Sequence, residues 1–202
     1  MASKTHVSAA VGIAGIALVL QVVGFVLPGW LVINIGENSI GIGLWSIESC
    51  VKEDCISITM EQVFHEPGQR MASASLSWKE YQVEATLSLI GAFLSICLLT
   101  AQTIVICVSK VNTTNSINTL AVLGASTSIG SALIGFIVVG RMAYVILNLM
   151  DVLPVISAPY ALIIFALGSF VSIWVGGIEF FLRGMSRRES QTPYTNFENI
   201  AI

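Results

Sequence analysis

The sequence predicts a membrane fold of the all-α class, a four-helix transmembrane bundle that carries a small extracellular antiparallel β-sheet. Three observations predict it. Four long apolar stretches follow one another along the chain, one long polar loop separates the first two, and that loop contains Cys50 and Cys55. The composition agrees, because 55% of the residues are hydrophobic and only 10% are charged, against roughly 25% charged in an average soluble protein.

Each apolar stretch is long enough to cross a bilayer as a helix. The first, residues 7–27, has 21 residues without a charge, which at a rise of 1.5 Å per residue spans roughly 30 Å. Its apolar run is longer than that of a signal peptide and no small-residue cleavage site follows it, so we interpret it as a retained helix. The other predicted spans are residues 85–108, 117–140 and 160–181.

The segments between the spans set the predicted topology. They are a long loop, a short turn, a second loop and a tail, at residues 28–84, 109–116, 141–159 and 182–202. Four spans place both termini on one side, and basic residues close to the helix ends indicate that this side is cytoplasmic. These residues are Lys110, Arg183, Arg187 and Arg188. The two loops are therefore expected outside the cell, on a chain of one domain in the plasma membrane.

Small residues recur at helical spacing in the spans. Helices in lipid close-pack through such residues, because the hydrophobic effect does not drive them together there. Two stripes are formed by Thr127, Ser131 and Gly135, and by Gly168, Ser172 and Gly176, while Gly12 and Gly24 flatten the first span. No ionisable residue shares the stripes, so packing is favoured over a transport path.

The long loop is predicted to fold into a small sheet. Residues 31–35, 40–45 and 55–60 are β-prone runs, and residues 36–39 and 51–54 between them supply turn chemistry. This pattern predicts two hairpins that share a middle strand. Cys50 and Cys55 flank the second turn, where α-carbons of opposed residues lie within about 5.5 Å, close enough for a disulfide.

The cysteines leave two alternatives open. Cys50 and Cys55 could bind a metal with His65 as a third ligand, but no fourth ligand stands out and an extracellular pair oxidises readily. We therefore expect a disulfide and no metal. Cys97 and Cys107 lie within the second span and are interpreted as reduced packing residues, although Cys107 could accept a palmitoyl group.

At this point the residues resemble a family. A first span that ends near Pro28-Gly29-Trp30, followed by Gly43-Leu44-Trp45 and two loop cysteines, is similar to the signature of the claudins and their peripheral myelin protein relatives. The specific matches are Trp30, Gly43, Leu44, Trp45, Cys50 and Cys55. The chain differs from claudins in a shorter gap between the cysteines, in an apolar second outer loop, and in Glu84 where claudins commonly carry an arginine.

The resemblance implies a cell-cell junction protein. Claudins associate side by side in one membrane and head-on with those of a neighbouring cell, and they form paracellular barriers or charge-selective pores. In this chain the predicted long loop has eight acidic and three basic residues, so a pore that it lined would favour cations. The candidate selectivity residues are Glu48, Glu53, Asp54 and Glu61, of which we expect Glu53 and Asp54 to matter most. A solvated acidic surface is the alternative.

Trp30, Leu44 and Trp45 are expected to anchor the loop on the bundle, since large rings favour the membrane interface. The last residues, Ile200-Ala201-Ile202, suit the PDZ domains that bind an apolar C-terminus. A second function therefore stays open: an adaptor of the same superfamily, which binds a channel or receptor laterally, or an adhesion protein that forms no barrier.

No enzymatic activity is expected. The two histidines, His6 and His65, are predicted on opposite sides of the membrane, so they cannot share a site. No phosphate-binding loop, dinucleotide fingerprint or zinc motif occurs in the sequence. The expected partners are the lipid bilayer, further copies of the chain and a PDZ scaffold, with no cofactor and no nucleic acid.

Overall fold

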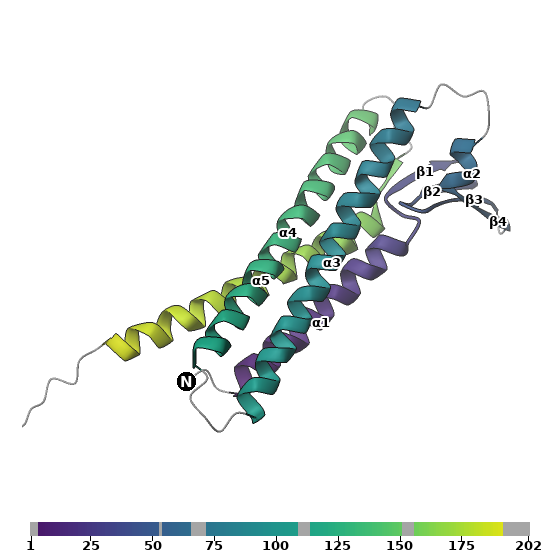
Figure 1. Cartoon of the computed structure of the whole chain (residues 1–202). Helices are drawn as coiled ribbons and strands as arrows, with labels where there is room; N and C mark the ends of the chain where they lie inside the picture. Colours follow the sequence, from purple (N-terminus) through teal and green to yellow (C-terminus); the bar gives the residue numbers. More distant parts are fainter. Residues whose placement is uncertain (1–3, 53, 66–71, 109–113, 151–155, 192–202) are drawn as a thin grey trace, which may run out of the picture.

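The computed structural model describes residues 4–52, 54–65, 72–108, 114–150 and 156–191. Four long helices run side by side, and a small sheet with a short helix lies at one end (Figure 1). In chain order the elements are α1 (Lys4–Val26), β1 (Leu31–Ile35), β2 (Asn38–Ile42), β3 (Ser46–Val51), β4 (Asp54–Thr59), α2 (Met60–His65), α3 (Ala72–Val108), α4 (Thr114–Met150), β5 (Ile156–Ser157) and α5 (Tyr160–Gln191). We call β1–β5 with α2 the cap.

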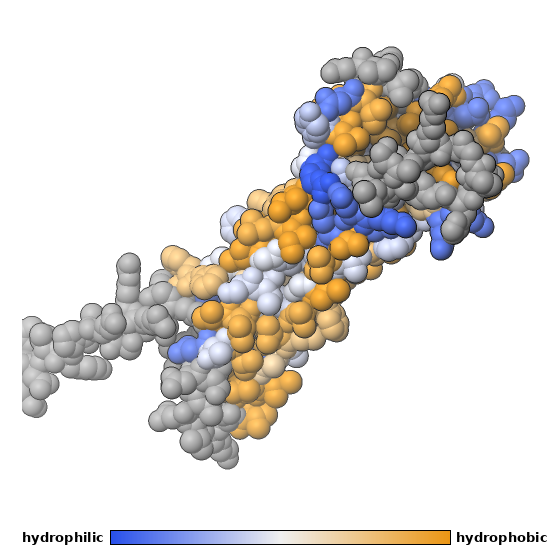
Figure 2. Space-filling model, turned by 45° about the horizontal axis from the view of Figure 1, so that its top comes forward, coloured by the Kyte–Doolittle hydropathy of each residue, from blue (hydrophilic) through white to orange (hydrophobic). Residues whose placement is uncertain are grey.

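The four long helices are apolar enough to cross a membrane. Over the described residues the apolar stretches are Ser8–Val26, Trp78–Val108, Ile117–Met150 and Tyr160–Phe181. On the face drawn in Figure 2, hydrophobic and weakly polar side chains line the helical shaft, while most of the hydrophilic side chains gather at the end that carries the cap. This distribution suggests a multi-pass membrane protein, because a water-soluble bundle would place its polar side chains along the whole shaft.

The bundle interior is built from small residues. On α3 the buried positions recur at spacings of three and four, as in a left-handed helical bundle; they are Tyr81, Ala85, Ser88, Ala92, Ser95, Leu99 and Gln102. α3 packs on α4, α1 on α5, α4 on α5 and α1 on α3. Small side chains at these positions let the helices approach closely, which is how helices associate in lipid.

Serine hydroxyls connect neighbouring helices. Ser88 Oγ on α3 donates to the Ser131 carbonyl at 2.9 Å, and Ser131 Oγ on α4 donates back to the Ser88 carbonyl at 2.6 Å. Ser128 Oγ donates to the Ser172 carbonyl on α5 at 2.8 Å. The predicted packing stripe is thus confirmed at Ser131. Thr127 differs, since its hydroxyl donates to carbonyls of its own helix.

α1 and α5 touch through their backbones at two glycines. A Cβ placed on Gly24 would lie 2.6 Å from the Phe165 nitrogen, and a Cβ on Gly168 would lie 2.8 Å from the Gln21 nitrogen. Neither position leaves room for a side chain, which confirms the packing prediction for both. Gly12 was also expected to pack, but nothing lies within 4 Å of a Cβ placed there, so that prediction is wrong.

The helices are longer than the predicted spans. α3 begins at Ala72 rather than at residue 85, and α4 continues to Met150 rather than ending at residue 140. The predicted loops 28–84 and 141–159 are therefore partly helical. The charged residues Glu84 and Arg141 end the apolar runs, but they do not end the helices, because both are good helix formers. From Arg141, α4 projects about 14 Å further.

The sheet has one hairpin and two strands more than predicted. Its strand order is β4-β3-β2-β1-β5, with every neighbouring pair antiparallel. The run at residues 40–45 was expected to be one strand, but β2 ends at Ile42 and a tight turn follows, in which the Gly43 amide donates to the Ser46 carbonyl at 2.8 Å. β5, from the second loop, pairs with β1.

Candidate functional site

The chain passes from α1 into the cap at Pro28-Gly29-Trp30, and this segment lies against the turn between β2 and β3. The Trp30 amide donates to the Ile42 carbonyl at 3.0 Å, which brings the two segments together. A Cβ on Gly41 would collide with the Pro28 carbonyl, and one on Gly43 would lie 2.8 Å from the Pro28 α-carbon. The glycine of the Gly43-Leu44-Trp45 signature is therefore required by this close approach.

Trp30 fills the centre of the contact between α1 and the cap. Its side chain is fully buried, and its ring lies 5.4 Å from that of Phe165 on α5. Its indole Nε1 donates to the Gly24 carbonyl at 2.8 Å. In a continuous helix that carbonyl would accept from residue 28, but Pro28 has no amide hydrogen. The Trp30 side chain thus supplies the donor that Pro28 removes from the end of α1.

Leu44 and Trp45 differ in their surroundings. Leu44 is 1% exposed, and its carbonyl accepts two side-chain hydrogen bonds from α3, from Trp78 Nε1 at 3.1 Å and Gln82 Nε2 at 2.5 Å. Trp45 is 43% exposed and packs edge-on against Phe25 of α1, with ring centres 5.2 Å apart. Leu44 therefore attaches the cap to α3, whereas Trp45 covers the end of α1.

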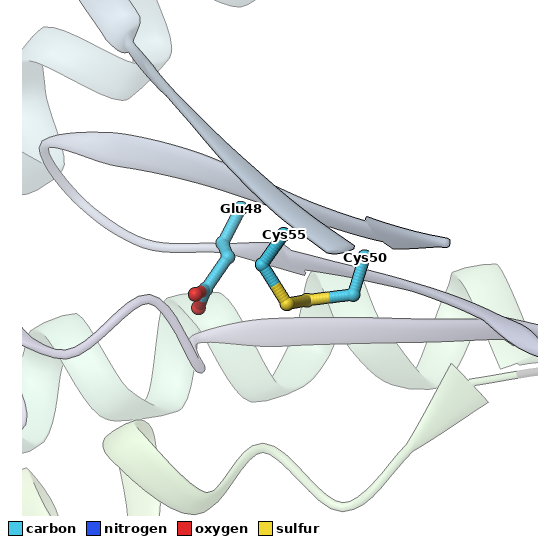
Figure 3. A group of neighbouring side chains, drawn as sticks. All are labelled: Glu48, Cys50 and Cys55. Atoms are coloured by element: carbon cyan, nitrogen blue, oxygen red, sulfur yellow. A yellow bond between two sulfur atoms is a disulfide. The ribbon is translucent and has the colours of Figure 1, made fainter. Parts of the chain in front are cut away.

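The predicted disulfide is confirmed. Cys50 on β3 and Cys55 on β4 are directly opposed in the sheet and bonded to each other. The Glu48 carboxylate lies on the same side of the sheet (Figure 3), within 4.8 Å of the sulfurs. Since neither sulfur is a thiolate while the bond is intact, these three side chains do not form a metal-ligand set. The side chain of His65 lies outside the described part of the chain.

The sheet has one apolar and one polar face. Directly opposed residues share a face, and successive residues alternate between faces. The register therefore puts one set of apolar side chains on a single face: Leu31, Ile33, Ile35, Ile40, Ile42, Ile47, Val51, Ile56, Ile58 and Ile156. Leu31, Ile33, Ile42 and Ile156 belong to the core that the cap shares with the helices. The other face carries Glu48, the disulfide and mostly hydroxyl side chains.

The structure separates the candidate selectivity residues. Glu48 lies half-buried in the middle of the polar face, beside the disulfide. Asp54 is opposed to Val51, so it belongs to the apolar face at the hairpin tip, and Glu61 is exposed in the first turn of α2. Glu53 and the tail residues Ile200, Ala201 and Ile202 lie outside the described residues. Glu48 alone of the described candidates therefore accompanies the disulfide on the polar face.

One cluster was missed by the sequence analysis. Arg141 of α4 forms ion pairs with Glu80 and Glu84 of α3, so two of the acidic residues counted in the loop are already neutralised in part. The sequence did contain a signal for this cluster: Glu84 and Arg141 carry opposite charges, and each lies at the end of one of two neighbouring apolar runs. Because both had been assigned to loops, no contact between them was expected.

In comparisons with known proteins, no family model and no curated sequence matches the chain.

Proposed function

We propose that this protein is a claudin-like cell-cell junction protein, which forms a paracellular barrier or a cation-favouring paracellular pore by self-association. The observation that carries the proposal is a disulfide-closed, two-faced sheet seated on four apolar helices. In the proposed orientation the cap faces the space between cells, and both termini are cytoplasmic. The C-terminal residues 200–202 are available to a PDZ scaffold in that orientation.

Self-association is supported by the free edge of the sheet. β4 is the last strand in the sheet order, and no described segment pairs with its outer side. Ile56 and Ile58 on this strand are 66% and 42% exposed. An edge strand presents unpaired backbone groups, and exposed apolar side chains beside it add a hydrophobic contact. A second copy in the same membrane could satisfy both.

The junction function and the adaptor function can be separated by electron microscopy. Cells that otherwise lack junction strands, when they express this protein, are expected to show continuous intramembranous strands at cell contacts in freeze-fracture replicas. The reason is that a head-to-tail association, in which β4 of one copy meets a different surface of the next, would produce linear polymers, whereas a symmetric contact would stop at a dimer. Surface delivery of the chain without strands would favour the adaptor or adhesion function instead.

Glu48 is the residue most suited to select cations in this proposal. It carries a negative charge on the polar face, and no described basic group lies within ion-pair distance of it. Glu48→Gln is expected to lower the sodium-to-chloride permeability ratio of an expressing epithelial monolayer, measured by dilution potentials, because a fixed negative charge attracts cations to the path.

Asp54→Asn is the matched control, since it removes the same charge from the opposite face of the sheet. It should change the permeability ratio less than Glu48→Gln does. An equal effect of the two substitutions would mean that net charge of the cap, and not its polar face, sets the selectivity; an unchanged ratio in both would remove the cap from the conduction path.

A further inference from the structure

Arg141 of α4 connects two carboxylates and an aromatic ring of α3 at the cap end of the bundle. Its Nη2 donates to Glu80 Oε2 at 2.9 Å, and its Nη1 donates to Glu84 Oε1. The guanidinium carbon lies 4.9 Å from the centre of the Tyr81 ring. Tyr81 is buried in the core shared by the helices and the cap, so the cluster rests on well-packed structure.

The two carboxylates depend on this single guanidinium. Glu80 and Glu84 are one helical turn apart on α3, where like charges destabilise each other. Arg141 lies between them and converts this repulsion into attraction. An isolated exposed pair contributes little to stability, but a forked guanidinium that binds two carboxylates forms a network with defined geometry. Glu84 Oε2 is buried without a hydrogen-bond partner among the described residues, which increases its dependence on Arg141.

The same two turns of α3 also hold the cap. Trp78 and Gln82 donate to the Leu44 carbonyl in the turn between β2 and β3. The Trp78 ring packs edge-on against Tyr81, with centres 6.1 Å apart. Side chains of one short helical segment therefore contact α4 through Arg141 and the cap through Leu44. A movement of this segment away from α4 would carry the cap with it.

We propose that Arg141 is a positioning residue for the cap: it locks the outer turns of α3 against α4 and so fixes the orientation of the sheet on the bundle. β5 adds a second link, because it joins the α4–α5 connection to β1. The segment between α1 and α3 and the segment between α4 and α5 are thereby coupled through the β1–β5 pair. A contact that moves one of these segments therefore also moves the other. The inference rests on these contacts and stands independently of the proposed junction function.

Spin-label distances test the orientation of the cap directly. Nitroxides are attached through Ser57→Cys on β4 and Leu123→Cys on α4, both at exposed positions, in a chain with Cys97→Ser and Cys107→Ser reconstituted in lipid nanodiscs. The parent chain is expected to give a single narrow distance distribution by double electron-electron resonance. Arg141→Gln should shift and broaden it, with the disulfide and the helix content retained.

A charge exchange separates positioning by the ion cluster from a general loss of packing. Arg141→Glu and Glu84→Arg should each broaden the distribution alone, while the two together should restore the narrow peak. Lys52→Gln is the control, because it removes the distant exposed pair with Glu37, whose charged atoms are 4.0 Å apart; it should leave the distribution unchanged.

Two results would overturn the inference. One is an unchanged distribution in Arg141→Gln, and the other is a double exchange that stays as broad as its single substitutions. If Arg141→Gln does not fold, Glu80→Gln decides, since Glu80 is half-exposed and its loss leaves the Glu84 pair in place. Partial broadening in Glu80→Gln supports positioning by the cluster, and an unchanged distribution contradicts it.

Discussion

Gly168→Val is expected to cause one of the largest losses of stability among single substitutions in the bundle. A Cβ at this position would lie 2.8 Å from the Gln21 nitrogen and 2.9 Å from the Ala17 carbonyl oxygen. Both are backbone atoms of α1, so no side-chain rotation can relieve the overlap and the two helices must separate. Overpacking of this kind costs about 3 kcal/mol. The measurement is the unfolding free energy in detergent micelles, together with the fraction of the chain delivered to the cell surface.

Gly177→Val is the matched control on the same helix. Nothing lies within 4 Å of a Cβ at Gly177, and this position is exposed on the apolar surface of α5. The same substitution should therefore leave the unfolding free energy nearly unchanged. Equal losses at the two positions would show that valine is poorly tolerated in α5 in general and that the α1–α5 contact is not specially tight.

The sequence predicts the bundle and the disulfide well, because both follow from local patterns. Apolar length identifies each long helix, and the spacing of Cys50 and Cys55 around a polar turn predicts their opposed positions in a hairpin. Helix ends are less predictable. Hydropathy measures how far a helix is apolar, and residues such as Glu84 and Arg141 end an apolar run while the helix continues beyond it.

The contact between α1 and the cap could not be derived from local patterns. Gly43 lies within a run that alternates apolar residues with glycine, so the turn there is indistinguishable from a continuing strand until Pro28 is known to pack against it. The roles of Trp78, Gln82 and Arg141 likewise depend on contacts between segments far apart in the chain. The strand register, by contrast, places Glu48 on the face that carries the disulfide and Asp54 on the opposite face, and this changes which acidic residue is the preferred candidate for selectivity.

Trp30→Ala is expected to cause the largest loss of stability among substitutions in the contact between α1 and the cap. The side chain is fully buried against Phe165, and truncation of a buried tryptophan costs about 3–5 kcal/mol through lost contacts and a cavity. The loss should appear as a reduced unfolding free energy and as retention of the chain inside the cell. Trp45→Ala should cost less, because Trp45 is 43% exposed.

Trp30→Phe separates the two roles of this side chain. Phenylalanine keeps most of the ring contacts but removes the indole N–H, and the Gly24 carbonyl then loses the donor that replaces the amide hydrogen missing at Pro28. A buried carbonyl left without a partner costs about 1–3 kcal/mol, so Trp30→Phe should lie between Trp30→Ala and the parent chain in unfolding free energy. If Trp30→Phe has the same unfolding free energy as the parent chain, the hydrogen bond to Gly24 contributes nothing to stability. The contact between α1 and the cap is then held by packing of the ring alone.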